Sequence, residues 1–316
     1  MRYRIYALAP TQYEITGVVQ TCEVKEMHEQ LAAECIINLA NVQYQKKYLS
    51  GLLVPPYKVM VAYEGKEMFQ GHIVESEYDS AREKLIDLTC YDPTWYMQQS
   101  QIAYYIPANT SSNKVIEDIA SLAGFAIVNK APNMPLQAKK YQSNTVAEII
   151  LDILKMVKEY TGIECILRSS SGLVEIITKG FNSTMYYLDV RNVENIQQGL
   201  SIQNMVTRAK IVYTDSEGGN ISNEAELSNN TSYGIIQRIV NRNSNQTLAQ
   251  AKAEAQSILD EHSKPEETIG FQSVDIPLLR KSDRISVAAG SIVSELYVSE
   301  ITHDIREGKM RVELSR

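Results

Sequence analysis

The feature that most constrains this chain of 316 residues is a strand pattern that occurs twice, once in each half. Residues 58–90 read as a short β-branched strand, a turn, a longer strand that ends in polar and acidic residues, a charged turn and a closing strand. Residues 284–315 repeat this order, spacing and strand polarity. Convergence of two unrelated β-meanders is the alternative. We favour a duplication, which predicts two copies of one β-domain with other structure between them.

The first hundred residues read as β-structure. Residues 17–24 and 35–42 are β-branched and alternate between apolar and polar side chains. A hairpin over 58–76 and a strand over 84–91 follow, and the last strand ends at an Asp-Pro pair. We expect an antiparallel meander that closes into a first β-barrel over 1–103.

The middle of the chain changes to a helical period. One helix is predicted over 113–123 and a second one ends at Thr161, and their N-cap candidates are Thr110 or Ser111 and Ser143 or Asn144. A hairpin over 164–178 follows the second helix. These elements predict a small α/β domain over 104–182.

The last third returns to strands, among them 208–213 and 233–240, with a turn at Gly218-Gly219. One helix interrupts them over 247–262, before Pro265. We expect a second β-barrel over 183–316 that carries this helix. The predicted fold class is therefore α+β, mainly β, with two antiparallel β-barrels flanking the α/β domain.

Composition excludes several classes of function. The 38 acidic and 31 basic side chains give a net charge of −7, which argues against strong binding to nucleic-acid phosphates. No run approaches the roughly 20 apolar residues that span a bilayer, and the N-terminus lacks the apolar region of a secretory signal. The 19 tyrosines against four phenylalanines suit interfaces better than a dry core.

No catalytic, cofactor or metal site is predicted. The chain has no nucleophile elbow, P-loop or dinucleotide-binding glycine motif, and its histidines show no zinc spacing: His28, His72, His262 and His303. His303 is the most ligand-like, but a hydrogen-bonded turn histidine is the favoured interpretation. Asp92 is interpreted as a capping residue rather than a lone catalytic acid. The cysteines are expected to be reduced, partly buried thiols: Cys22, Cys35, Cys90 and Cys165.

The best candidate contact surface is the connection over 44–57. Its two adjacent prolines exclude a central strand, so we expect an irregular loop or arm. It mixes aromatic and aliphatic anchors with positive charge, and its candidate interface residues are Tyr44, Lys46, Lys47, Tyr48, Leu52, Leu53 and Tyr57. The alternative is a loop folded over one end of a barrel.

Several motifs, in this order, resemble a known family. They include Phe69-Gln-Gly-His-Ile-Val, the run from Leu88 to Met97, the helix start from Ser112 to Ala120 and the strand from Val298 to Asp304. The chain resembles the baseplate hub proteins of contractile phage tails and phage-like particles, of the type found in PBSX-like prophages. That family is related to the tail hub of large contractile phages and to the N-terminal part of type VI secretion spike proteins.

The resemblance implies a structural protein rather than an enzyme. It implies two tail-tube-like barrels per chain and a homotrimer that joins the hexameric tail tube to a trimeric spike. The implied partners are the tube, the spike, other baseplate proteins and the tape-measure protein, with DNA as passing cargo and no stable membrane association. The implied location is the baseplate of a virion tail, assembled in the bacterial cytoplasm. A tail-associated peptidoglycan hydrolase and a carbohydrate- or surface-binding β-module are the alternatives.

Overall fold

The computed structural model describes residues 2–9, 11–44, 46–79, 84–182, 184–189, 193–214, 221–242, 246–289 and 292–315. The chain divides into two compact units, one of residues 1–196 with 270–316 and one of residues 197–269. The described elements are mostly strands with a few helices, which confirms the α+β, mainly β class. Within the described ranges no helix is both long and apolar enough to cross a membrane.

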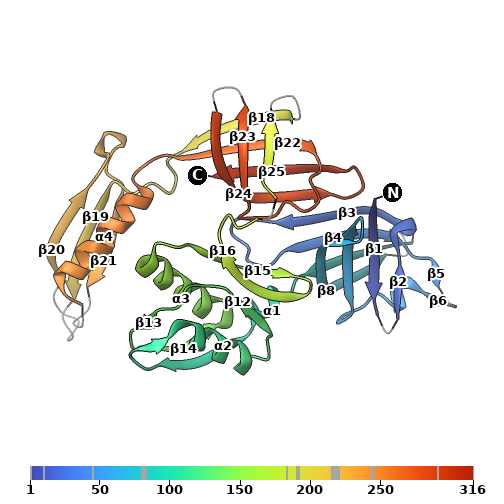
Figure 1. Cartoon of the computed structure of the whole chain (residues 1–316), viewed down its shortest axis with the longest axis horizontal. Helices are drawn as coiled ribbons and strands as arrows, with labels where there is room; N and C mark the ends of the chain where they lie inside the picture. Colours follow the sequence, from blue (N-terminus) through green and yellow to red (C-terminus); the bar gives the residue numbers. More distant parts are fainter. Residues whose placement is uncertain are drawn as a thin grey trace. The chain divides into compact units, whose positions relative to one another are not determined.

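The N-terminal strands form one antiparallel set in the order β3-β4-β9-β8-β7-β1-β2 (Figure 1). Alternation of apolar and polar residues puts one face of each strand into a shared core, as Cys35, Ile37 and Leu39 show in the fourth strand. The bounds are β1 Tyr3–Leu8, β2 Gln12–Glu14, β3 Val19–Glu26, β4 Glu34–Ala40, β7 Lys58–Tyr63, β8 Lys66–Asp79 and β9 Leu85–Tyr91.

A second set of strands has the order β18-β22-β25-β24-β23-β17. Its strand β24 also pairs with β3, so that both sets belong to one sheet. The bounds are β17 Tyr186–Asp189, β18 Val193–Ser201, β22 Glu266–Val274, β23 Arg284–Ala289, β24 Ile292–Asp304 and β25 Lys309–Ser315. Strands β18 and β22 are shared between the two compact units.

The two predicted meanders have the same strand register. His72 faces Tyr91 in the first meander, and Tyr297 faces Ser315 at the matching place in the second. Both central strands then skip one residue at the same point, Val74 in β8 and Ser299 in β24. The preceding strand is also in register, because Lys58 faces His72 as Arg284 faces Tyr297. Shared pairing and a shared bulge favour a duplication over convergence.

The correspondence extends beyond the meanders. In sheet order, β3-β4-β9-β8-β7-β1 matches β18-β22-β25-β24-β23-β17 position by position. The match is not complete, because β17 runs parallel to β23 whereas β1 runs antiparallel to β7. Among the described residues the sheet runs as a path from β18 to β2 and does not return on itself. Closure into two barrels therefore stays a prediction.

The segment between the two sets packs two amphipathic helices on short strands. Helix α2 (Ser112–Leu122) has Ser111 as its N-cap, as predicted, and helix α3 (Val146–Thr161) ends at the left-handed Gly162. The cap of α3 is Thr145 rather than the predicted Ser143 or Asn144, because Thr145 and Glu148 form a capping box. The strands are β10 Gln101–Ile106, β11 Thr110–Ser111, β12 Ile127–Asn129, β13 Pro135–Leu136, β14 Lys139–Thr145, β15 Cys165–Ser170 and β16 Leu173–Thr178.

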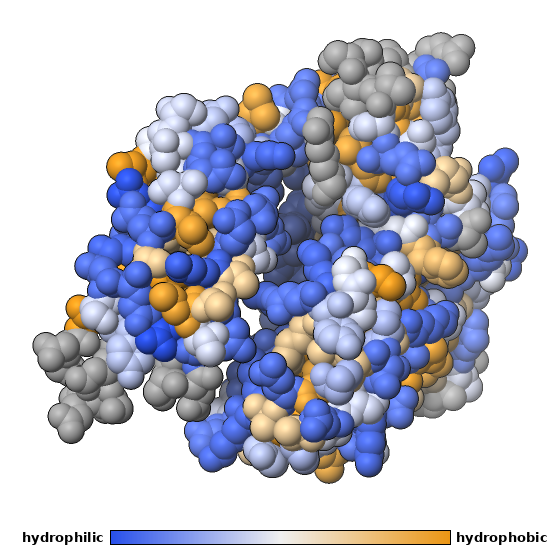
Figure 2. Space-filling view, turned by 60° about the vertical axis from the view of Figure 1, so that its left-hand side comes forward, coloured by the Kyte–Doolittle hydropathy of each residue, from blue (hydrophilic) through white to orange (hydrophobic). Residues whose placement is uncertain are grey.

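The unit of residues 197–269 has its own small core. Helix α4 (Leu248–His262), predicted over 247–262, lays Ala251, Ala255 and Leu259 on the sheet β20-β19-β21. The sheet's strands are β19 Arg208–Thr214, β20 Ile221–Ser228 and β21 Gln237–Arg242. Apolar side chains are exposed on this unit, including Ile221, Ile235 and Ile239. Figure 2 shows apolar surface, in orange, among the hydrophilic surface of the molecule.

The strand predicted over 233–240 begins only at Gln237, because the 3₁₀ turn η4 (Thr231–Tyr233) and Gly234 precede it. The predicted turn at Gly218-Gly219 lies outside the described residues. The domain boundaries 1–103, 104–182 and 183–316 stay predictions, and the unit of residues 197–269 falls inside the third of these ranges.

Candidate protein–protein interface

The predicted interface arm is more ordered than a loop. Gln43–Tyr44 (β5) and Lys47–Tyr48 (β6) form a tight hairpin, and a 3₁₀ turn over Leu49–Gly51 (η2) follows. Lys46, which precedes β6, has a positive φ of 68°. The expectation of an irregular arm over 44–57 is therefore wrong for Tyr44 and for residues 47–51, which lie in these elements.

The arm has an inner and an outer half. Leu53 is completely buried in the core of the first strand set, with Leu52 and Tyr57 packed against it. Tyr48 is 53% exposed, and both lysines of the hairpin are exposed. Tyr44 stacks on Tyr13 with ring centroids 4.9 Å apart. The structure thus brings Tyr44, Lys46, Lys47 and Tyr48 together on the surface, whereas Leu53 is available only as a core residue.

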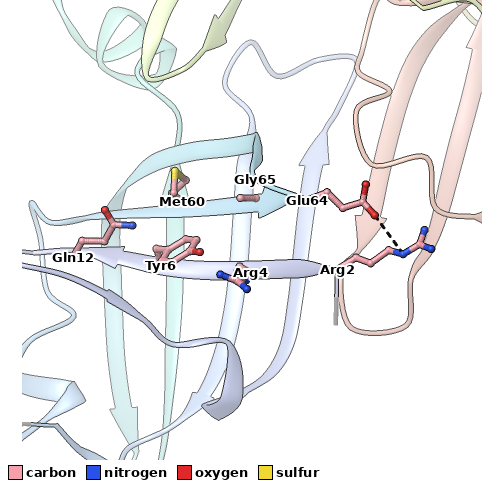
Figure 3. Close-up of a pocket in the computed structure, with 8 residues that line it drawn as sticks. Arg2, Arg4, Tyr6, Gln12, Met60, Glu64 and Gly65 are labelled. Carbon is pink, nitrogen blue, oxygen red and sulfur yellow. Dashed lines mark ion pairs between the residues drawn. The ribbon is translucent and has the colours of Figure 1, made fainter.

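A second surface, which the sequence analysis missed, lies along β1 and β7. Figure 3 shows the outward side chains Arg4 and Tyr6 on β1 beside Met60 on β7, in an open groove of about 460 Å³. At one end Arg2 Nε lies 3.4 Å from the Glu64 carboxylate. The signal was present in the alternation of Arg2, Arg4 and Tyr6 along the first strand. The groove offers cationic and aromatic groups to a partner surface.

A buried charge cluster lies where β3 and β15 meet the turn before β23. The Arg280 guanidinium donates two hydrogen bonds to the Glu26 carboxylate, at 2.8 and 3.0 Å, and a third to the Ser169 carbonyl at 2.6 Å. Lys281 donates to the carbonyls of Met27 and Gln30. This cluster holds the two strand sets and the α/β segment together, so it fixes the sheet that presents both surfaces.

The charges of the cluster stabilise one another. Burial alone would raise the pKa of Glu26, but the charge and hydrogen bonds of Arg280 outweigh it and the pKa is lowered. The pKa of Arg280 is correspondingly raised, despite its own burial. Arg168 Nη1 extends the cluster by donating to Asp283 Oδ1, at 3.1 Å.

Asp92 confirms the predicted capping role. Its Oδ1 accepts hydrogen bonds from the backbone N–H of Thr94 at 2.9 Å and from the Thr94 hydroxyl at 2.5 Å, just before helix α1 (Thr94–Gln99). Burial raises the pKa of Asp92 to about 6, although Thr94 and Arg280 oppose the shift. A carboxylate at this position therefore costs folding free energy at neutral pH.

We expect Asp92→Asn to stabilise the chain at pH 7. The folded-state pKa lies above the unfolded value, so the wild type loses stability as the pH rises from about 4 through 6. The amide keeps the acceptor oxygen and removes the charge, for a gain of up to about 3 kcal/mol. Denaturant unfolding at pH 4 and pH 7 checks this result. The gain in stability must vanish at pH 4. An equal gain at pH 4 and pH 7 would show that the charge of Asp92 is not its cause.

The remaining candidate residues, His303 and the four cysteines, are buried. His303 is buried, with Nδ1 2.6 Å from Asp275 Oδ1 and Nε2 3.0 Å from the Leu279 carbonyl, which confirms the hydrogen-bonded histidine. The cysteines are buried and free, as expected: Cys22, Cys35, Cys90 and Cys165. In the part of the chain that the structure describes, no three His, Cys, Asp or Glu side chains are grouped so that they could hold a metal ion.

Comparison with known proteins places the fold among phage tail proteins. The chain is 24% identical over 228 residues to the uncharacterized protein YqbQ of Bacillus subtilis, covering 70% of this chain and 68% of the relative. It superposes on a tail protein of Neisseria meningitidis with a TM-score of 0.74 and 13% identity, over 100% of this chain and 97% of the other.

A component of the E. coli type VI secretion system, described as structurally similar to T4 tail proteins gp27 and gp5, matches with a TM-score of 0.57 and 11% identity over 94% of this chain and 73% of the other. The resemblance to tail hub proteins is thus confirmed at the level of the fold. A family model described as YqbQ-like matches residues 23–315, so the chain belongs to the YqbQ-like family.

Proposed function

We propose that the chain is the structural, non-enzymatic baseplate hub of a contractile phage tail or phage-like injection particle. Three copies would join a hexameric tail tube to a trimeric spike. The observation that carries the proposal is the repeated strand set, with the same order, register and bulge in both halves of the sheet. Three chains with two equivalent strand sets each present six equivalent surfaces to a tube of six subunits.

The proposal includes two tube-like barrels, one built on each strand set. In a ring of three chains the two sets alternate, and head-to-tail contacts between unlike surfaces close such a ring. The unit of residues 197–269 is then an insertion between two strands of the second set, β18 and β22. The fold shared with a phage tail protein and with a secretion-system component supports this assembly.

The proposed partners follow from the same position. They are further copies of the chain, the tail tube protein, the trimeric spike, other baseplate proteins and the tape-measure protein, all in the virion tail. DNA would pass only as cargo, and the net charge of −7 disfavours phosphate contacts that would hold it. The exposed hairpin Tyr44–Tyr48 is the proposed contact for one of these proteins, because it offers aromatic area beside two lysines.

The experiment is native mass spectrometry of the chain mixed with the tube protein of the same particle. We expect a complex of three hub chains and six tube chains. Tyr48→Ala is expected to weaken this complex roughly tenfold, as the loss of an interface tyrosine does. The matched control is Tyr160→Ala on α3, which removes a tyrosine that is 67% exposed elsewhere.

If Tyr48→Ala and Tyr160→Ala weaken the complex equally, the hairpin does not contact the tube protein. A chain that stays monomeric and releases fragments from purified cell wall would contradict the hub and favour a hydrolase.

A further inference from the structure

A cavity of about 290 Å³ lies between the start of β8, the hairpin of β15 and β16, and the turn before β23. All its described lining residues belong to the unit of residues 1–196 and 270–316. Four of them are cationic and two carry a carboxylate: Lys66, Lys130, Arg168 and Arg280 against Glu175 and Asp283. The lining is therefore positively charged, although the net charge of the whole chain is −7.

The two arginines of the cavity are already bound by carboxylates. Arg168 donates from Nε to Glu175 at 3.0 Å and from Nη1 to Asp283 at 3.1 Å. Arg280 is bound by Glu26, which does not line the cavity, and its backbone N–H donates to Asp283 Oδ2 at 3.0 Å. Both carboxylates of the lining are thus taken up by the arginines.

The two lysines have no such partner. Lys66 is the first residue of β8, and Lys130 follows β12, where its backbone N–H donates to the Ile176 carbonyl at 3.0 Å. Both side chains are exposed, and within the described ranges neither ammonium group forms an ion pair or a hydrogen bond. An anion that enters the cavity gains attraction from both ammonium groups without displacing a carboxylate.

An exposed aromatic side chain also lines the cavity. Phe181 is 67% exposed, and its position is set by the next residue, Asn182, whose side chain bonds both the backbone N–H and the carbonyl of Arg284. Burial and the nearby Asp283 carboxylate raise the pKa of the Tyr186 hydroxyl, so this group stays protonated and can donate to an anion. The cavity therefore combines positive charge with apolar area and a hydroxyl donor.

We propose that this cavity binds an acidic segment of a partner protein, in which an aspartate or glutamate lies next to a large apolar side chain. The carboxylate pairs with Lys66 and Lys130, and the apolar side chain covers Phe181. Charge complementarity favours an acidic partner, and the volume, at the small end of the range for ligand pockets, suits side chains of a segment rather than a folded domain.

A protein carboxylate fits the cavity better than a phosphate. None of its described lining residues belongs to a helix N-terminus, where backbone N–H groups bind phosphate. This inference does not rest on the proposed hub, because all the groups that it uses belong to one chain.

Titration calorimetry of the full chain at low ionic strength tests the charge. The probes are two tetrapeptides with blocked ends, Glu-Phe-Asp-Leu and Gln-Phe-Asn-Leu, which differ in charge but hardly in shape. The acidic peptide is expected to bind on the order of tenfold more tightly than the neutral one. The double variant Lys66→Gln, Lys130→Gln is expected to weaken the acidic peptide about tenfold and to leave the neutral one unchanged.

The matched control is the double variant Lys114→Gln, Lys155→Gln, which removes two exposed charges from α2 and α3. It is expected to bind both peptides as the wild type does. Because all four lysines are exposed, both double variants are expected to keep the unfolding temperature of the wild type.

The apolar contact is tested with Phe181→Ala, which is expected to weaken both tetrapeptides severalfold, because their own phenylalanine loses a ring to pack against. Tyr160→Ala is the control, since Tyr160 is also 67% exposed and does not line the cavity. It is expected to leave both affinities unchanged.

Three results would overturn the proposal: an acidic peptide that binds no more tightly than the neutral one, equal losses in the two lysine double variants, or equal losses in Phe181→Ala and Tyr160→Ala. A duplex DNA oligonucleotide that binds and loses as much affinity in the Lys66, Lys130 variant would show that the cavity takes polyanions in general, and would overturn it as well. The proposed hub is tested separately, by its complex with the tube protein.

Discussion

Replacement of Glu26 by glutamine is expected to lower the free energy of unfolding by about 3–5 kcal/mol, measured by denaturant titration at pH 7. The substitution leaves the Arg280 guanidinium buried without the carboxylate that binds it, and breaking a buried ion pair is far more costly than breaking an exposed one. The damage should reach beyond one strand, because Arg280 also binds Ser169 of the α/β segment.

The Glu26–Arg280 pair makes the stability of the protein sensitive to acid. The pKa of Glu26 is lowered in the folded state, so its contribution is present above the unfolded pKa near 4.5 and is lost as the pH falls through the folded value. Glu26→Gln should therefore remove part of the acid destabilisation of the wild type.

Two controls separate the charge effect from a general loss of packing. Glu64→Gln breaks the exposed pair with Arg2, whose side chains are 57% and 74% exposed, and is expected to change stability by less than about 0.5 kcal/mol. The double variant Glu26→Met, Arg280→Met removes both charges and should recover most of the loss. A single variant as stable as the wild type would show that the cluster does not hold the strand sets together.

Gly71→Ala is expected to destabilise the first strand set by about 3 kcal/mol. A Cβ atom at this position would lie 2.5 Å from the Tyr91 carbonyl oxygen and 2.7 Å from its carbon, and it would also meet the Phe69 ring. The buried Phe69 side chain would have to shift as a whole, and the backbone of β9 can move only by distorting the pairing of β8 and β9. This contact explains why a glycine follows Phe69 and Gln70 in the motif.

Gly17→Ala is the matched control, since no atom lies within 4 Å of the added methyl group and its φ is not positive. Its effect is expected to stay within about 0.5 kcal/mol of the wild type. Both variants are compared by chemical denaturation under the same conditions. Equal free energies of unfolding would mean that β8 and β9 accommodate a methyl group at position 71 without loss of stability.

Local patterns predicted the elements well because their causes are local. The two meanders follow from alternation, and the helices follow from apolar stripes between capping residues such as Ser111 and Gly162. The cap of α3 was missed by one residue, because Ser143, Asn144 and Thr145 are all good caps and only the reciprocal bond with Glu148 decides between them.

The contacts that join the segments were not predictable in the same way. Glu26 and Arg280 are 254 residues apart, and nothing local in either segment indicates that a carboxylate and a guanidinium will be buried together. The pairing of β24 with β3 is equally non-local. The arm over 44–57 was predicted only in part. Its composition identified the candidate anchor residues, but only the fold shows that Leu53 is buried in the core and that Tyr48 is exposed.

The central claim is that two equivalent strand sets per chain build one ring from three chains. Cryo-electron microscopy of the purified assembly tests it most directly. We expect a ring of three chains in which the meanders 58–90 and 284–315 alternate at nearly equal angular steps, giving six similar positions. A ring in which the two meanders occupy unrelated positions, or a preparation that contains only single chains, would contradict the account.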